Sequence, residues 1–175
     1  MLSAPTVIIA PTAKLVTLPE ACAYLRLEEG SLDTEIEGYI ASAISDIERM
    51  TSTRLAPQTV DILADRFSDL AHLAIGPVQS VTSIRYQNQD GDSFDLDETI
   101  FELFGAHLDR GIRLRAGATW PAVRSVTAVI TIRLVVGYPI LPAHLKRALL
   151  DAIRQQFDGS PVDLFTATIN DRIWL

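Results

Sequence analysis

The chain has 175 residues, a mass of 19.2 kDa and ordinary contents of hydrophobic (48%) and charged (21%) residues, which exclude wholesale disorder and fibrous repeats. Its net charge of −7 argues against a general nucleic-acid coat, because such a protein needs a basic surface that displaces counterions. The one cysteine excludes an internal disulfide framework, and no apolar run approaches the roughly 20 residues that cross a bilayer. We therefore expect an acidic, soluble protein that does not act on membranes.

The N-terminal part of the sequence predicts an arm followed by a helix. Residues 1–16 contain two prolines and no helical pattern, and we expect them to be extended. A first helix is predicted over residues 17–28, because Thr17 and Glu20 have the spacing of a capping box. In that motif, a hydroxyl and a carboxylate each accept a hydrogen bond from a backbone amide at the start of the helix. Gly30 is placed to end this helix.

Two further helices are predicted over residues 33–53 and 142–158, each from a single apolar stripe at helical spacing. The N-cap of the second helix is either Ser31 or Asp33, and Gly159 is placed to end the third helix. The two stripes consist of Ile36, Ile40, Ile44 and Ile47 in the second helix and of Leu145, Leu149, Ile153 and Phe157 in the third.

Residues 58–138, between the second and third helices, alternate polar and apolar side chains, which is typical of strands. Asp90-Gly91 predicts a hairpin because a tight turn needs positive φ, and Asp109–Gly111 predicts another turn. The predicted strands are Val60–Ile62, Ile84–Tyr86, Phe94–Leu96, Ile112–Leu114 and Val129–Val136, the last of them central.

The predicted fold class is therefore α+β: a bundle of about three helices with a β-rich insertion between the second and the third. Residues 17–159 would form one domain, preceded by the arm and followed by a tail, residues 160–175.

The charges are spread unevenly along the chain. Residues 1–110 hold 7 basic and 18 acidic side chains, whereas residues 111–175 hold 8 basic and 4 acidic ones. Chance is one explanation, and a subunit whose acidic side meets a basic side of another copy is the other. On that second interpretation, the subunit contacts are made by acidic residues of the second helix and by later arginines. These candidates are Glu35, Glu37, Asp46, Glu48, Arg113, Arg115, Arg133, Arg147 and Arg154.

No pattern in the sequence predicts catalysis, a metal site or a cofactor. The three histidines lie in different segments, and Cys22 lies on the apolar side of the first helix, where a buried structural thiol is expected. Neither a glycine-rich phosphate loop nor a G-x-S-x-G elbow is present. We therefore expect a protein that is not an enzyme and that holds no cofactor or metal.

Several short segments, taken in order, resemble the head–tail connector (adaptor) proteins of tailed phages. The resemblance begins with LVTLPEA at Leu15–Ala21 and YLRL at Tyr24–Leu27, and it covers about residues 14–158. Pro19 and Cys22 depart from the usual pattern, and the tail matches more loosely. The other matching segments are Ile40–Ala43, Asp46–Glu48, Thr51–Leu55, Gln58–Val60, Ile75–Ile84, Trp120-Pro121 and Val135–Tyr138.

This resemblance implies a structural virion protein that forms a ring in the neck of a particle. The ring, a dodecamer on a twelvefold portal, would lie between the portal protein and a downstream neck protein, a stopper or tail terminator. Packaged DNA would pass through it without specific binding, and the subunit would be cytoplasmic before assembly. The particle could be an infectious phage, a prophage product or a gene transfer agent. The alternative function is a small cytoplasmic α+β regulator that binds a ligand or peptide.

The tail carries large apolar side chains that show no helical stripe, and exposed side chains of this kind promote aggregation unless something covers them. We expect the tail to be a flexible peptide that orders when it docks on the portal, because Trp and Arg are enriched where interfaces bind most strongly. Packing on its own domain is the alternative. The predicted contact residues are Leu164, Phe165, Ile169, Arg172, Ile173 and Trp174.

Overall fold

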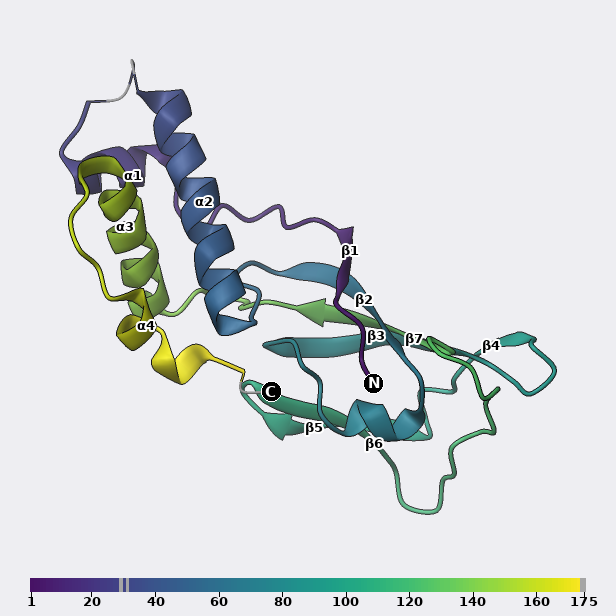
Figure 1. Ribbon diagram of the computed structural model, residues 1–175. Coiled ribbons are helices and arrows are strands. Elements are labelled where there is room, and N and C mark those ends of the chain that lie inside the picture. The colour runs from purple at the N-terminus through teal and green to yellow at the C-terminus, as the bar shows by residue number, and fades with distance from the viewer. Residues whose placement is uncertain (29, 31, 174–175) are drawn as a thin grey trace.

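The α-helices and the strands gather at opposite ends of an elongated molecule (Figure 1). The computed structural model describes residues 1–28, 30 and 32–173. The α+β class is confirmed, and every pair of named strands is antiparallel. The helices are α1 (Leu18–Leu25), α2 (Asp33–Thr51), α3 (Ala143–Asp158) and α4 (Leu164–Ala167), with the 3-10 helices η1 (Phe67–Ala71) and η2 (Ile169–Asp171). The strands are β1 (Thr6–Ile9), β2 (Gln58–Ala64), β3 (Val78–Gln87), β4 (Ser93–Asp95), β5 (Phe101–Ala106), β6 (Asp109–Leu114) and β7 (Ile130–Val136).

Helix α1 begins with the capping box that the sequence predicts. The backbone N–H of Thr17 donates to Glu20 Oε2 at 2.9 Å, and the N–H of Glu20 donates to the Thr17 hydroxyl at 3.4 Å. The helix is shorter than predicted, because Arg26 adopts a left-handed φ of 61° and ends it. Gly30 therefore lies in the loop beyond the helix and does not stop it.

Apart from Phe157, the apolar stripes of α2 and α3 are buried together with one side of α1 in a single hydrophobic cluster. Phe157, predicted as the last stripe residue of α3, is half-buried and lies outside that cluster. Ile40 and Ile44 are half-buried at the margin of the cluster. The fully buried stripe residues are Ile36, Ile47, Leu145, Leu149 and Ile153. The periodicity of the sequence therefore gives the correct inner face of both helices.

The ends of α2 and α3 follow local backbone chemistry. Helix α2 stops before residue 53, because Ser52 takes a left-handed φ of 56°. The N-cap of α2 is Leu32, so the predicted cap at Ser31 or Asp33 is wrong; Asp33 is the first helical residue, and Ser31 lies outside the described residues. The Asp33 carboxylate instead accepts the N–H of Gly30 at 2.7 Å. Gly159 ends α3 as predicted, with a φ of 73° that favours glycine.

Strand β7 is the centre of a five-stranded sheet with the order β1-β2-β7-β3-β4. Its inward-facing residues Ile130, Ile132 and Leu134 are inaccessible to solvent, which confirms the predicted central strand. The hairpin β5–β6 forms a second, two-stranded sheet. Its residues Phe101 and Ile112 belong to the same hydrophobic cluster as the large sheet.

The two predicted turns in the strand region differ in outcome. Asp90-Gly91 lies in the loop between β3 and β4, and Gly91 has the expected positive φ of 96°, although the loop is longer than a two-residue turn. Asp109–Gly111 is not a turn, because these residues begin β6. The chain instead reverses at His107, which has a φ of 52°, between β5 and β6. The turn was misplaced because strand β5, the partner of β6, was not predicted.

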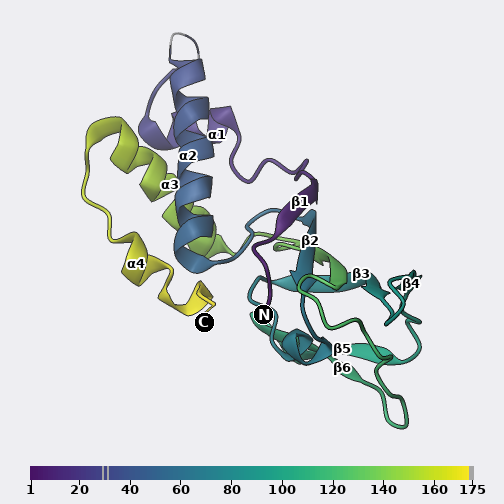
Figure 2. The same cartoon turned by 45° about the vertical axis from the view of Figure 1, so that its right-hand side comes forward.

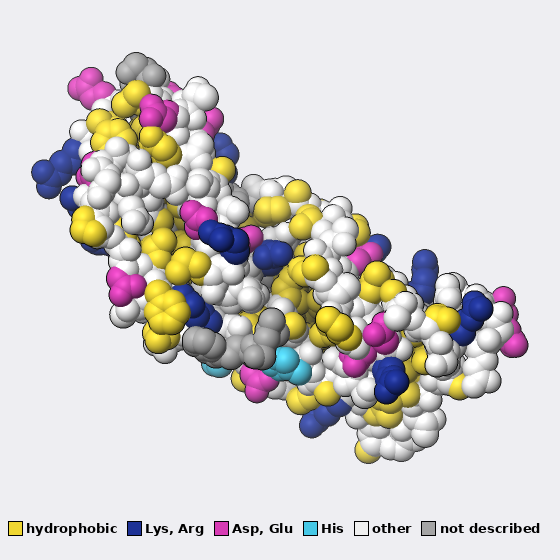
Figure 3. All heavy atoms as spheres, viewed as in Figure 1, with side chains coloured by type: hydrophobic (Ala, Val, Ile, Leu, Met, Phe, Trp, Pro, Cys, Tyr) yellow, Lys and Arg dark blue, Asp and Glu magenta, His cyan; other side chains and the backbone are white. Residues whose placement is uncertain are grey.

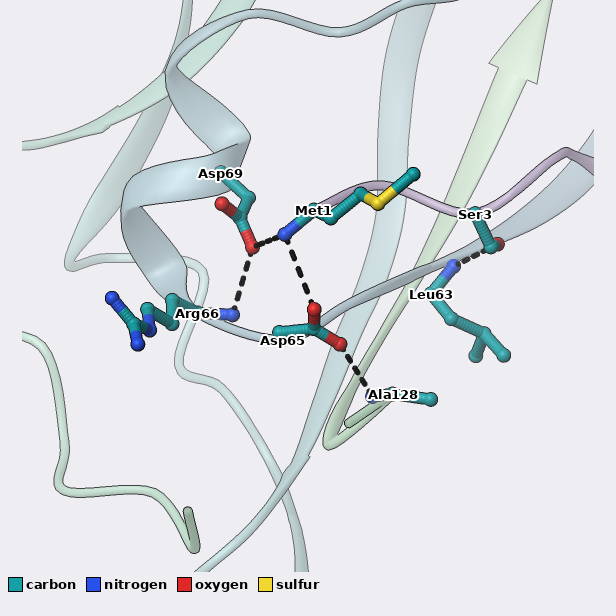
Figure 4. Close-up of polar contacts among 7 residues, drawn as sticks. All are labelled: Met1, Ser3, Leu63, Asp65, Arg66, Asp69 and Ala128. Atoms are coloured by element: carbon teal, nitrogen blue, oxygen red, sulfur yellow. Dashed lines mark hydrogen bonds and ion pairs between the residues drawn. The ribbon is translucent and has the colours of Figure 1, made fainter. Parts of the chain in front are cut away.

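The N-terminal arm is extended and bound along the edge of the sheet. Strand β1 pairs with β2, and the N–H of Ser3 donates to the carbonyl oxygen of Leu63 at 2.8 Å. The Met1 ammonium group lies 2.5 Å from Asp69 and 3.3 Å from Asp65 (Figure 4). The arm is therefore fastened at its first residue and along its strand.

The helical cluster and the sheet cluster are two separate hydrophobic cores, and among the described elements no α-helix packs broadly against a strand; the 3-10 helix η1 belongs to the sheet cluster. The chain passes from α2 to β2 through a buried joint, residues 51–56. Thr53 and Leu55 are inaccessible to solvent there, and Thr53 forms a parallel bridge with Gly76 next to β3.

Glu48 holds this joint from the last turns of α2. Its carboxylate accepts the N–H of Leu55 at 2.8 Å and lies 3.7 Å from the Arg54 guanidinium. Burial raises the pKa of Glu48 above its ordinary value. Glu48 was predicted as an exposed residue that contacts a neighbouring subunit. Its side chain is instead largely covered, because the chain turns back after Ser52 and packs over it.

We expect Leu149→Ala to lower the free energy of unfolding by about 2–5 kcal/mol, because it leaves a cavity in the helical core. The matched control is Ile140→Ala, since Ile140 is 86% exposed and its truncation should change stability by less than about 0.5 kcal/mol. Urea denaturation followed by circular dichroism measures both. Equal losses from the two variants would contradict the assigned helical core.

The capping box predicts a pH dependence. The Lys146 ammonium donates to Glu20 Oε1 at 2.7 Å, and this bond together with the Thr17 amide lowers the pKa of Glu20 to about 2. Because the folded pKa lies below the reference value of 4.5, the carboxylate stabilises the fold above that pH, and its contribution is lost as the pH falls toward 2. Glu20→Gln should weaken the pH dependence of the free energy of unfolding between pH 4.5 and about 2, and Lys146→Met should weaken it similarly. An unchanged profile in both variants would refute the assignment.

We expect Glu48→Ala to cost about 1–3 kcal/mol of stability, because it leaves the Leu55 N–H unpaired at the joint. Glu37→Ala is the matched control on the same helix, because Glu37 is exposed and has no hydrogen-bond or ion-pair partner within the described part of the chain. That control should stay within about 0.5 kcal/mol of the parent protein. Denaturant titration at neutral pH distinguishes the two, and a Glu48→Ala variant as stable as the control would contradict this role.

Candidate assembly surfaces

The five arginines predicted to make subunit contacts all have partners within their own subunit. Arg133 on β7 donates two bonds of 2.8 Å to Asp61 on β2, which is a bidentate pair across neighbouring strands. Arg115 donates to the carbonyl oxygen of Phe101 at 2.9 Å. The other pairs are Arg113–Glu102 at 2.7 Å, Arg147–Asp151 at 3.0 Å and Arg154–Asp158 at 3.3 Å. Four of these five arginines are thus neutralised by a carboxylate of their own subunit, and Arg115 is held by a carbonyl oxygen.

The four predicted acidic contacts on α2 have unlike environments. Glu35 and Glu37 are exposed, and Glu35 accepts a hydrogen bond from the Tyr39 hydroxyl. Asp46 pairs with Arg49 at 3.0 Å on the same helix, and Glu48 belongs to the joint. The structure therefore leaves Glu35 and Glu37 as the acidic side chains of this set that are most available to a neighbour.

The tail is not a free peptide, because its described part packs on the home subunit. Short helices α4 and η2 form within it, and Thr168, Asp171 and Ile173 are buried (Figure 1). Phe165 and Ile169 remain exposed, by 48% and 42%. The tail consequently has two faces, one against the subunit and one toward solvent, which its irregular sequence pattern did not show.

A polar cluster fixes the inner face of the tail. The Asp171 carboxylate lies 2.8 Å from His144 Nε2 on α3 and accepts a 3.4 Å hydrogen bond from the Tyr138 hydroxyl. Burial, with the Asp171 charge nearby, raises the pKa of Tyr138. The sequence did not reveal this cluster, because Asp171 lies 27 residues beyond His144 and 33 beyond Tyr138 and shares no motif with them.

Two other predicted tail contacts have distinct positions. The Arg172 guanidinium carbon lies 3.8 Å from the centre of the Phe165 ring, a cation–π contact that braces the outer face. Leu164 is half-buried against the helical core. Trp174 lies outside the described residues.

The visible surface carries hydrophobic side chains interspersed with charges of both signs, and no single charged stripe dominates it (Figure 3). Strand β1 exposes Val7, Ile8 and Ile9 at one edge of the sheet. A cleft of about 740 Å³ lies between the β5–β6 turn, the β7–α3 connection and the tail, with His144 and Asp171 in its wall. These features are suited to contacts with other macromolecules.

Groups that could support other chemistry are scarce in the described part of the chain. No set of three or more His, Cys, Asp and Glu side chains there is arranged to hold a metal ion. His72 is paired with Asp109 at 3.3 Å, His107 lies in a hairpin turn, and Cys22 is buried. None of the described helices is long and apolar enough to span a membrane.

Neither a family model nor a curated protein matches the sequence. Solved structures do match. A chain of the neck of an empty gene transfer agent particle, computed with C6 symmetry, aligns with a TM-score of 0.79 and 18% identity over 99% of this chain and 97% of that chain. A chain from the virion of a native gene transfer agent particle aligns with a TM-score of 0.77 and 21% identity over 98% of this chain and 96% of that chain. A chain of the neck of a native particle, computed with C12 symmetry, aligns with a TM-score of 0.73 and 19% identity over 99% of this chain and 97% of that chain. This protein therefore shares, over almost its whole length, the fold of chains found in the necks of gene transfer agent particles.

Proposed function

We propose that the protein is a head–tail connector (adaptor) subunit in the neck of a phage-like particle. The observation that supports this most is the match of nearly the whole chain, including its two-part architecture, to chains of gene transfer agent necks. On this proposal the helical bundle with its β-rich insertion forms a ring between the portal protein and a downstream neck, stopper or tail terminator protein. The protein would have a structural role and would catalyse no reaction.

The chemistry of the surface is consistent with this role. A connector must let DNA pass without binding it. A net charge of −7 repels phosphate, and arginines that already pair with carboxylates of their own subunit are less available to bind it. The matching necks were computed with C6 and C12 symmetry, and a dodecameric ring on a twelvefold portal accords with both values. A ring of identical subunits needs two unlike surfaces on each copy.

We assign these unlike surfaces to α2 and to α3, which carries Arg147 and Arg154. Glu35 and Glu37 present carboxylates on α2, and Arg147 and Arg154 lie on α3 of the neighbouring copy. In this arrangement an exposed arginine shares its guanidinium between its own aspartate and the neighbour's glutamate. The exposed tail residues Phe165 and Ile169 are then left for the portal.

Reversing two of these charges tests the assignment. In the Arg147→Glu/Arg154→Glu variant we expect a folded monomer, because the lost i,i+4 pairs contribute only about 0.2–0.5 kcal/mol each. In the strain that makes the particles, this variant should leave the ring position of the neck empty in cryo-EM maps and lower the yield of particles that retain DNA.

The control restores each pair inside the subunit with its polarity reversed, by adding Asp151→Arg and Asp158→Arg to the two charge reversals; because Asp151 also accepts the Tyr24 hydroxyl, the fold of this variant is checked by circular dichroism before assembly is scored. If the arginines serve only their own helix, this quadruple variant should assemble normally. If they contact a neighbour, as proposed, it should remain defective. Full, DNA-containing particles from the double variant would refute the contact, and a neck without any density for the wild-type chain would refute the connector role itself.

A further inference from the structure

The two hydrophobic cores are connected by few segments, and the tail is one of them. Besides the α2–β2 joint, the chain crosses between the helices and the sheet at the link into α1 and at the β7–α3 connection. The tail leaves α3, runs below the C-terminal end of α2 and reaches the β5–β6 hairpin (Figure 1). A second view shows the same course, with α4 beside α3 and the following residues directed toward the strands (Figure 2).

The contacts of the tail with the helical part are specific. Asp171 is paired with His144 on α3, and the N–H of Ile173 donates to the carbonyl oxygen of Thr51, the last residue of α2, at 2.9 Å. Thr51 is itself only 1% exposed. The tail therefore satisfies a buried carbonyl at the end of α2, a group that the helix cannot pair internally.

The same residue also reaches the sheet part. A Cβ built on Gly76, next to the first residues of β3, would lie 3.3 Å from Ile173 Cδ1 and 3.4 Å from Leu108 Cδ2 in the β5–β6 turn. Ile173 is only 8% exposed. The Ile173 side chain thus packs beside Gly76, just before β3, at the place where the end of α2, this segment and the β5–β6 turn come together.

The tail is also separable from both cores. Residues 159–163, which link it to α3, form no helix or strand and are exposed or half-buried. Among the described tail residues, Leu164 is the one apolar side chain that packs against the helical core, at its margin, and Ile173 is in neither core cluster. Segments with few buried apolar contacts open at a lower free energy than the global fold.

We propose that residues 164–173 form a C-terminal clasp that holds the helical part and the sheet part at one angle, and that opens without unfolding either core. When the clasp is closed, Asp171 holds the tail on the helical part through His144 and Tyr138, and Ile173 bridges the two parts. When it opens, the α2–β2 joint and the β7–α3 connection alone set the angle, and the two parts sample a wider range. This device rests on the contacts described above and does not depend on the connector role.

A distance measurement on the full-length chain tests the clasp. Spin labels at Ser45→Cys on α2 and Thr127→Cys beside β7, both exposed, report the distance between the parts in a Cys22→Ala background. We expect Asp171→Ala and Ile173→Ala to broaden the distance distribution from pulsed electron paramagnetic resonance. Ile169→Ala is the matched control, because it removes the same atoms from the exposed face of the same segment, and it should leave the distribution unchanged.

Hydrogen exchange of the unsubstituted protein provides the second measurement. The amide of Ile173 should exchange at least ~30-fold faster than that of Ile132 in the middle of β7, because the clasp opens locally while the sheet stays folded. Equal exchange rates would overturn the proposal, since the tail would then open only with global unfolding. A narrow, unshifted distance distribution in both clasp variants would also overturn it, and so would loss of the whole fold on Asp171→Ala or Ile173→Ala.

Discussion

The joint at the end of α2 is the constraint on which the arrangement of the molecule depends. Two hydrophobic cores that share no broad helix–strand packing can keep one orientation only if the short connections between them are rigid. The joint supplies part of this rigidity, which the proposed clasp completes, because Glu48 accepts the Leu55 amide, and the Arg54 amide donates to the Gly76 carbonyl oxygen at 2.7 Å. Both bonds lie beside side chains that exclude water, so they are stronger and better defined than exposed ones.

The parts of the fold that could be predicted from the sequence are those decided by neighbouring residues. The capping box at Thr17, the stop at Gly159 and the stripes of α2 and α3 are local signals, and they are correct in the structure. Strand β5 was missed because its identity depends on pairing with β6. The early end of α1 was also missed, since a left-handed Arg26 has no signature in the sequence.

The candidate surfaces show the same division. The pairs Arg147–Asp151 and Arg154–Asp158 follow from i,i+4 spacing on a helix, and sequence alone could have identified them. The pair Arg133–Asp61 joins residues 72 positions apart through strand register, which a count of charges along the chain does not reveal. Nor could periodicity show that the tail has an inner face, because its buried carboxylate is matched by histidine and tyrosine from distant segments.

The low identity of the matching neck chains has a physical explanation that bears on function. At 18–21% identity most residues differ, yet nearly the whole chain superposes. Cores tolerate extensive hydrophobic replacement when volume and pattern are kept, so a shared two-part architecture does not require shared side chains. Surface pairs such as Arg113–Glu102 are under still weaker structural constraint, because exposed ion pairs contribute little to stability. On the proposed function, a ring subunit of this fold can change the chemistry of its contacts to suit its own neighbours while the joint between its two cores keeps the geometry that places those contacts.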